Sequence, residues 1–161
     1  KYSMSRNQEL MKSVQPERRQ SLLGALLQAV YWADESLQES LLASGFERIP
    51  RTWSMVMVNI SNGVKRPIRI AENVGISRQA IQKTLQEMSQ AGLIDITPDP
   101  EDRRATIVSF SPRGRPIQEA ARYIMGEIER ELEQRVGRKQ VKQLHDTLER
   151  DWGALVVIEG D

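Results

Sequence analysis

One face of a short segment near the middle of the chain carries side chains that can hydrogen-bond to DNA. The apolar residues Ile81, Leu85 and Met88 repeat there at helical spacing. Because these side chains would turn inward, the polar residues between them must project from the opposite face of the helix. That outward face carries Arg78, Gln79, Gln82, Lys83 and Gln86.

These residue types match the chemistry of base recognition in the major groove. Arginine and lysine donate to guanine edges or phosphates, glutamine can form two hydrogen bonds with adenine, and the start of a helix attracts a phosphate. An ordinary surface helix with a solvated polar face has the same pattern. The segment alone therefore leaves DNA recognition and simple solvation equally open.

The surrounding residues predict that this helix is the second helix of a helix-turn-helix within residues 67–92. Gly75 permits a tight turn because glycine adopts a positive φ without a Cβ penalty, and Ser77 is a suitable N-cap for the second helix. The first helix is predicted to turn three residues toward the second: Ile68, Ala71 and Val74.

A dense apolar run at residues 53–60 precedes the helix-turn-helix. Its length suits either a strand or a buried helix. We interpret it as a helix, because Thr52 can cap it and the next elements are helical.

Two short β-rich runs follow the helix-turn-helix, at residues 93–96 and 107–110, around a polar tip. They predict a hairpin, and a hairpin in this position is a wing. Arg103 and Arg104 lie near the tip, where a wing could place them on phosphates or in the minor groove. The acids Asp99, Glu101 and Asp102 share that loop, so a solvated turn with internal ion pairs is the alternative.

Long amphipathic segments occupy both ends of the chain. The first runs from Pro16 to a stop at Gly45, and the second opens with Ser111 and Pro112, a predicted N-cap and first-turn proline, and continues to Gly137. A last helix is predicted to align Val141, Leu144, Leu148, Trp152 and Leu155. These apolar stripes need a surface to cover them, so we expect a helical homodimer interface built from both ends.

The predicted fold class is mostly α (α+β), with three regions. Residues 1–15 form a polar N-terminal arm, for which a frayed arm and a short helix both remain open. Residues 16–50 and 112–158 form a helical dimerisation region, and residues 51–111 form a winged helix-turn-helix DNA-binding domain.

The charge of the 161-residue chain is unevenly distributed although its net value is only +1. Residues 63–115 contain nine Lys or Arg against six Asp or Glu, whereas residues 116–161 contain seven against ten. The basic excess falls on the predicted helix-turn-helix and wing, which is the sign required to face phosphates.

The composition argues against several other classes of protein. No apolar run reaches the ~18 residues of a membrane span, and the absence of cysteine fits a reducing cytoplasm. The single histidine, His145, lies beside an apolar stripe and is interpreted as structural. We find no glycine-rich phosphate loop, metal-ligand spacing or nucleophile–base pair, so we expect neither an enzyme nor a cofactor or metal site.

Two stretches resemble the MarR family of winged-helix transcriptional regulators: IAENVGISRQAIQKTLQEMSQAGLI at residues 70–94 and PDPEDRRATIVSFSPRGR at residues 98–115. The resemblance implies a homodimer on pseudo-palindromic DNA, with the recognition helix in the major groove and the wing in the minor groove. Matched by position, it assigns Ser77, Arg78, Gln79, Gln82 and Lys83 to the recognition helix and Arg103 and Arg104 to the wing. Asp102 matches a wing acid that often pairs with a nearby arginine.

The chain also departs from the family pattern. Asp95, Ile96 and Thr97 stand where members often have basic residues, and the cysteine and metal ligands of the family's peroxide and zinc sensors are absent. Many members bind small aromatic or amphipathic effectors between the dimer arms and the winged domain. Such a cleft would lie near Tyr31, Trp53 and Met57, although all three are also typical core residues.

These observations favour a sequence-specific DNA-binding transcriptional regulator, acting as a homodimeric repressor in the cytoplasm without a membrane partner. The alternative is a winged-helix protein-interaction module in which DNA binding is secondary or lost. The acids Asp95, Asp99, Glu101 and Asp102 motivate that alternative.

Overall fold

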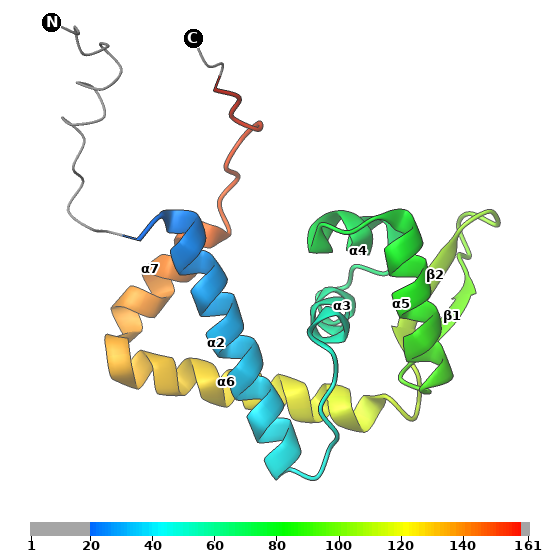
Figure 1. Ribbon diagram of the computed structural model, residues 1–161, viewed down its shortest axis with the longest axis horizontal. Helices are drawn as coiled ribbons and strands as arrows, with labels where there is room; N and C mark the ends of the chain where they lie inside the picture. Colours follow the sequence, from blue (N-terminus) through cyan, green and yellow to red (C-terminus); the bar gives the residue numbers. More distant parts are fainter. Residues whose placement is uncertain (1–19, 159–161) are drawn as a thin grey trace, which may run out of the picture.

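The computed structural model describes residues 20–158, which form six helices and one antiparallel hairpin (Figure 1). The predicted N-terminal arm and the predicted helix start at Pro16 lie outside these residues. The elements in chain order are α2 (Leu22–Ala43), α3 (Arg51–Ser61), α4 (Pro67–Val74), α5 (Arg78–Gln90), β1 (Ile94–Pro98), β2 (Thr106–Phe110), α6 (Arg115–Val136) and α7 (Arg138–Leu148).

Two bodies stand side by side in this arrangement (Figure 1). The first body, which we call the winged unit, comprises α3, α4, α5, β1 and β2. The second, which we call the helical arms, comprises α2, α6 and α7. Helix α2 crosses α6, and α6 is the long element that runs from the wing to α7.

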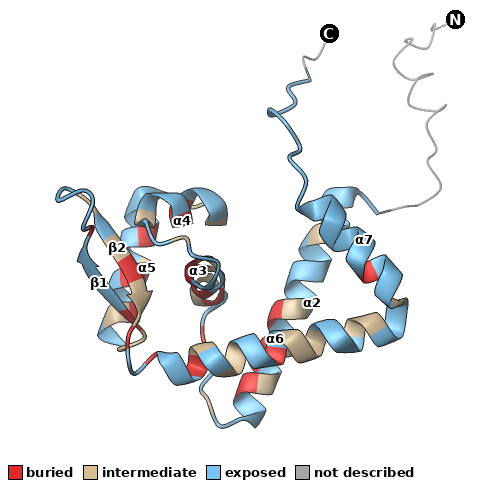
Figure 2. Ribbon diagram, turned by 180° about the vertical axis from the view of Figure 1, so that it is seen from behind, coloured by how far each residue is buried: buried red, intermediate tan, exposed pale blue. Residues whose placement is uncertain are grey.

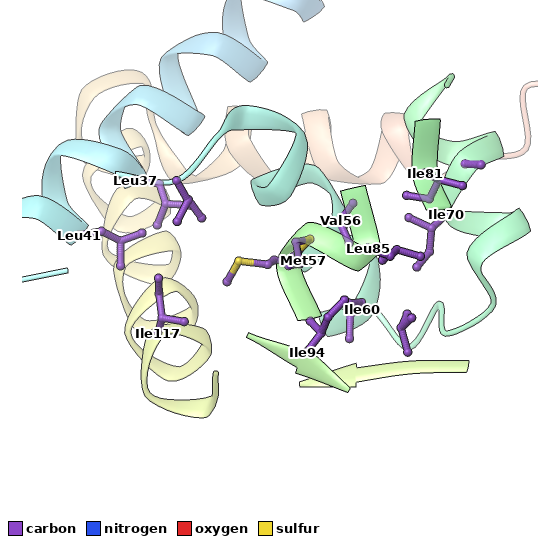
Figure 3. Close-up of a cluster of buried hydrophobic side chains, with 14 of the residues drawn as sticks. Leu37, Leu41, Val56, Met57, Ile60, Ile70, Ile81, Leu85, Ile94 and Ile117 are labelled. Atoms are coloured by element: carbon purple, nitrogen blue, oxygen red, sulfur yellow. The ribbon is translucent and has the colours of Figure 1, made fainter. Parts of the chain in front are cut away.

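The winged unit has a continuous apolar core because each of its helices turns one face inward. Figure 3 shows side chains from three helices and the hairpin converging there, with Met57 between this group and the arm residues Leu37, Leu41 and Ile117. The predicted inward stripe of the second helix is confirmed, since Ile81, Leu85 and Met88 are all buried.

The helix-turn-helix turns at Gly75, whose φ of 73° lies in the left-handed region that glycine adopts without strain. The predicted stripe of the first helix is only partly right. Ala71 is buried, but Ile68 is 38% exposed and Ile70 takes its place in the core. Ile68 and Ile70 are two positions apart, roughly 200° around the helix, so only one of them can face the core. Val74 is partly buried and packs against the core, as predicted.

The apolar run before the helix-turn-helix is a helix, as expected, rather than a strand. However, α3 begins at Arg51 after Pro50, which precedes it without a side-chain cap, so Thr52 lies inside the helix and does not cap it. Because the run is helical, Val56, Met57 and Ile60 lie on one buried face.

The wing is an antiparallel pair whose register sets Ile94 opposite Phe110 and Pro98 opposite Thr106. Both strands extend slightly further toward the tip than the sequence suggested. The backbone N–H of Val108 also donates to the carbonyl of Lys65 at 2.9 Å, which fastens the wing to the connection before α4.

The predicted start of α6 is wrong. The helix begins at Arg115, after Gly114, and Ser111 does not cap it. The Ser111 hydroxyl donates to the carbonyl of Gly92 at 2.6 Å and accepts from the N–H of Gly114 at 2.9 Å. Ser111 therefore ties the end of the winged unit to the beginning of the arm.

The last helix is shorter than predicted. The break at Gly137 is confirmed, but α7 ends at Leu148, so Trp152 and Leu155 do not continue its apolar face. Val141 is the residue of that face that is buried, and His145 lies half-exposed with Nε2 3.1 Å from Oε1 of Glu129. None of the helices described is long and apolar enough to cross a membrane.

Candidate nucleic-acid interface

Helix α5 starts at Ser77, and this start fixes which face of the helix points outward. The Ser77 hydroxyl accepts a hydrogen bond from the N–H of Ala80 at 3.1 Å, as an N-cap should. With the cap in place and Ile81, Leu85 and Met88 in the core, the intervening side chains have only the solvent side available. All five polar residues predicted on this face are exposed there: Arg78, Gln79, Gln82, Lys83 and Gln86.

A surface groove joins part of this face to the wing. Arg78 and Gln82 from α5 line it together with Arg104, which the hairpin supplies. The other four predicted contact residues are exposed but lie outside the groove lining: Ser77, Gln79, Lys83 and Arg103. The structure therefore gathers three of the seven predicted contact residues around one concave surface. Lys83 lies 3.8 Å from Glu87 in an exposed pair, which is too weak to immobilise it.

A residue missed by sequence reasoning, Arg66, lines the same groove and supports the wing. Its Nε donates to Oδ2 of Asp99 at 2.9 Å, and its second nitrogen lies 2.7 Å from the same oxygen. The N–H of Glu101 donates to the other carboxylate oxygen at 2.9 Å. Asp99 thus links the helix-turn-helix to the wing while remaining buried itself.

The surroundings of Asp99 stabilise its charged form. The backbone hydrogen bond from Glu101 lowers the pKa of the Asp99 carboxyl below its usual value of 3.8, and Arg66 lowers it further, against the opposing effect of burial. A negative charge is therefore built into the base of the wing. Its role is to position the wing, since a carboxylate would repel phosphates.

These contacts correct the prediction that Asp102 is the wing acid that pairs with an arginine. Among the residues described, the wing acid that pairs with an arginine is Asp99, not Asp102. Asp102 instead accepts a hydrogen bond from the backbone N–H of Arg104 at 3.0 Å, which shapes the tip of the hairpin. Arg66 precedes Pro67 and lies 33 positions before Asp99, so no local pattern could have indicated the pair.

The three residues expected near an effector cleft do not come together. Tyr31 is exposed, with the guanidinium of Arg51 4.6 Å from its ring centroid, and Trp53 packs partly buried against the core. Met57 alone lines a cavity of about 260 Å3 between α2, α3 and α6. The apolar part of that lining also includes Leu37, Leu41, Ile49 and Met125, with Ser54, Gln118 and Arg122 among the polar lining residues.

Three helices, an antiparallel hairpin and an outward-facing second helix define a winged helix-turn-helix protein. The sequence pattern of the MarR family matches residues 49–105, which cover nearly the whole winged unit. No curated protein sequence is similar enough to be matched.

Several solved structures share a fold with most of this chain, beyond the winged unit alone. NadR in complex with 4-hydroxyphenylacetate has 18% identity and a TM-score of 0.67, covering 83% of this chain and 93% of its own. The transcriptional repressor CouR, bound to a 23-mer DNA duplex, has 22% identity and a TM-score of 0.61, covering 91% and 96%. A variant of MarR from E. coli complexed with operator DNA has 21% identity and a TM-score of 0.58, covering 78% and 90%. The winged unit thus matches the MarR family pattern, and the described chain as a whole shares the fold of these solved structures.

Proposed function

We propose that this protein is a transcriptional regulator that binds a specific DNA sequence through α5 and the wing. The observation that carries the proposal is the exposed polar face of α5, which shares a groove with Arg66 and with Arg104 of the wing. Three guanidinium groups around one concave surface are suited to phosphates and guanine edges. CouR and the MarR variant, which share this fold, are bound to DNA in their solved structures.

Within this proposal the exposed side chains divide into two roles. Arg78, Gln79, Gln82 and Lys83 project from a helix narrow enough to enter the major groove, where arginine and glutamine can distinguish bases. Arg103 and Arg104 contact the backbone or minor groove beside it, and Ser77 presents the helix start to a phosphate. Arg66 holds the wing in position through Asp99.

We propose a homodimer as the binding form, with two copies of α5 reading two halves of a pseudo-palindromic operator. The support is the apolar surface of the helical arms, which one copy leaves exposed. Two half-sites would lie roughly 10 base pairs apart, centre to centre, so that both helices face the same side of the duplex. A dimer placed on a promoter would obstruct transcription, and repression is therefore the proposed mode of action.

We further propose that a small molecule with an aromatic or amphipathic body controls this binding from the cavity between α2, α3 and α6. Its apolar walls suit a single ring, and Arg122 could meet an acidic group on the ligand. The cavity adjoins a buried polar contact between the two bodies. Nε2 of Gln38 on α2 donates to the hydroxyl of Ser54 on α3 at 2.9 Å, and Oε1 of Gln38 accepts from the backbone N–H of Ile49. Ligand binding there could shift the winged unit relative to α2.

The alternative, a protein-interaction module, drew its support from acids in the wing. Two of them, Asp99 and Asp102, satisfy hydrogen bonds within the wing itself, which leaves less acidic surface for a partner. Salt dependence separates the two functions, because phosphate contacts make affinity fall steeply with added salt whereas a mainly apolar interface does not.

Selection of bound sequences from random duplex DNA with the purified protein tests the proposal directly. A two-fold-symmetric motif, bound with strong salt dependence, is the expected result. Recovery of no enriched sequence, or of binding that is indifferent to salt, would contradict DNA recognition through this face.

A further inference from the structure

The winged unit and the helical arms are joined at two places. At the first, the Ser111 hydroxyl donates to the carbonyl of Gly92, and the chain passes from the wing into α6. The second is the connection between α2 and α3, residues 44–50. A winged unit attached only at the first place could pivot on α6, so contacts at the second place must fix its orientation.

Apolar packing is incomplete where the two bodies face each other. A cavity of about 260 Å3 lies there, between α2, α3 and α6. Apolar contacts also have no preferred direction, so they define the angle between two bodies poorly. Hydrogen bonds and ion pairs are directional, and the orientation of the winged unit should therefore depend on the polar contacts beside the cavity.

The buried residues of α2 all fall in its second half, where α2 crosses α6 and leads toward α3 (Figure 2): Asp34, Leu37, Gln38 and Leu41. The two polar residues among them both contact α3 or the connection before it. Gln38 donates to the Ser54 hydroxyl on α3 at 2.9 Å and accepts from the backbone N–H of Ile49 at 3.1 Å. This neutral contact forms the inner side of the second attachment.

The outer side of the second attachment is charged. Arg48, in the connection, donates to Oε1 of Glu35 at 2.8 Å and also pairs with Glu39, about one helical turn further along α2. Arg51, the first residue of α3, donates to Oδ2 of Asp34 at 2.7 Å. A second nitrogen of Arg51 lies 3.9 Å from Oε2 of Glu35, which joins the pairs into one network. We call these five residues the charged joint.

Exposed ion pairs are usually weak, but the geometry of the charged joint strengthens it. Arg48 donates from two nitrogens to the two carboxylate oxygens of Glu35, and bidentate pairs within a network are the exception among surface pairs. The side chain of Asp34 is 3% exposed, so its charge depends on Arg51 beside it. The hydrogen bond from Arg48 lowers the pKa of the Glu35 carboxyl below its usual value of 4.5, so Glu35 is charged at neutral pH.

We propose that the charged joint determines which spacing of two DNA half-sites the protein accepts. This inference rests on the proposed function and adds specificity residues that do not touch DNA. In a dimer, the angle between each winged unit and its α2 sets the distance between the two copies of α5. Moving one half-site by one base pair displaces it by about 3.4 Å along the duplex and turns it by about 35° around the axis. A winged unit held at one angle therefore accepts one spacing, whereas a pivoting unit accepts several.

Affinities for duplexes that differ only in spacing test the proposal. The duplexes carry the half-sites that the natural protein selects, at the selected spacing and with the half-sites moved closer together or farther apart. A shift of one base pair should weaken binding by about tenfold or more for the natural protein and by about threefold or less for Arg48→Ala. Arg48→Ala should keep most of its affinity at the selected spacing, because Arg48 does not line the groove between α5 and the wing.

The matched control for the spacing experiment is Arg130→Ala. Arg130 pairs with Glu127 inside α6, so this variant also loses one exposed arginine but leaves the charged joint intact. It should keep the spacing preference of the natural protein. Equal spacing penalties for Arg48→Ala and the natural protein, or a natural protein that is indifferent to spacing, would overturn the proposal.

A second measurement needs no DNA. The chain has no cysteine, so Gln90→Cys places one spin label on each copy, at the exposed end of α5. The distribution of label-to-label distances in the dimer, measured by pulsed electron paramagnetic resonance, should widen with Arg48→Ala and stay unchanged with Arg130→Ala. A monomer, or a protein that selects no DNA sequence, would contradict the proposed function and this inference with it. A dimer that binds its motif, with an unchanged distance distribution in Arg48→Ala, would contradict only the inference.

Discussion

The winged unit and the helical arms have opposite relations to solvent. In the winged unit, Ile70, Ile81, Leu85, Met88 and Val108 are all essentially inaccessible, and most polar residues stay outside, with Ser54 and Asp99 as buried exceptions. In the arms, Leu37 and Leu41 are buried, but the leucines in the first half of α2 and those of α7 are more exposed, and Val141 is the buried residue of α7. The winged unit thus completes its core within one chain, whereas the arms present apolar surface that only another surface can cover.

This contrast separates two kinds of function. A self-contained core gives α5 a rigid support, which recognition of a fixed DNA sequence requires. In the proposed dimer the arms would set the position of one winged unit relative to the other, and the hydrogen bonds of Ser111 and Gln38 connect the arms to the winged unit. Substitutions that affect one body but not the other therefore test whether the two bodies differ in this way.

The largest contrast is expected between two leucines. Leu85→Ala should lower the free energy of unfolding by about 2–5 kcal/mol at any protein concentration, because it opens a cavity in a closed core. Leu23→Ala should have an effect that depends on protein concentration, because Leu23 is exposed among the described residues and the proposed dimer would cover it. Chemical denaturation at two protein concentrations measures both. If both variants lost the same free energy of unfolding at both protein concentrations, the two bodies would not differ in this way.

The same substitution at two glycines gives the next contrast. A Cβ at Gly114 would lie 1.9 Å from the carbonyl oxygen of Leu93, so Gly114→Ala should destabilise the protein by roughly 1–3 kcal/mol or more. At Gly126, within α6, the nearest atom would be 4.0 Å away, and Gly126→Ala should stabilise the helix by up to about 1 kcal/mol. Thermal unfolding followed by circular dichroism compares them. A harmless alanine at Gly114 would show that the tie between the bodies is not close-packed.

Loss of the α5 cap should have a smaller effect on stability. Ser77→Ala removes the acceptor for the Ala80 N–H and should cost about 1 kcal/mol, while Ser77→Asp should retain most of the stability because aspartate also caps helices. The Ser77→Asp variant should nevertheless bind DNA more weakly, since it places a negative charge beside a phosphate. The free energy of unfolding and the DNA affinity, measured on both variants, test the capping role and the phosphate-facing role of Ser77. If DNA affinity changed only in parallel with stability, the two roles would not be separate.

The smallest effect expected is on the pH dependence of the wing. Because the folded-state pKa of Asp99 is lowered, its stabilising contribution is complete above the unfolded-state value near 3.8 and is lost as the pH falls through the lower folded-state value. Asp99→Asn should therefore flatten the decline in stability below about pH 4 relative to the natural protein. Urea denaturation across that range measures it. If the free energy of unfolding fell equally steeply with pH in the variant and the natural protein, Asp99 would have no favourable charge interaction in the fold.

The parts of the fold that follow local rules could be predicted from the sequence. The turn at Gly75, the cap at Ser77 and the hairpin around the wing tip each depend on residues within a few positions of one another. The inward face of α5 was also predictable, because its 13 residues cover enough turns to fix the phase of the apolar stripe.

The parts that depend on distant contacts could not be predicted. Three acids share the wing loop, and only the approach of Arg66 selects Asp99 as the ion-pair partner. Ser111 has the local signature of a cap, but its hydroxyl is engaged by Gly92 from another part of the chain. Helix α7 ends at Leu148, and the indole N–H of Trp152 beyond it donates to the carbonyl of Thr147, a contact that apolar spacing does not indicate.

The affinity of a double variant of α5 for the selected DNA tests the central claim most directly. Arg78→Ala with Lys83→Ala should weaken binding by about tenfold to a hundredfold or more and reduce the salt dependence, with folding and dimerisation unchanged. Arg135→Ala with Lys139→Ala removes two exposed positive charges from the arms and should leave the affinity within about threefold of the natural protein. An α5 double variant that binds as tightly as the natural protein would contradict the assignment of α5 as the helix that reads DNA.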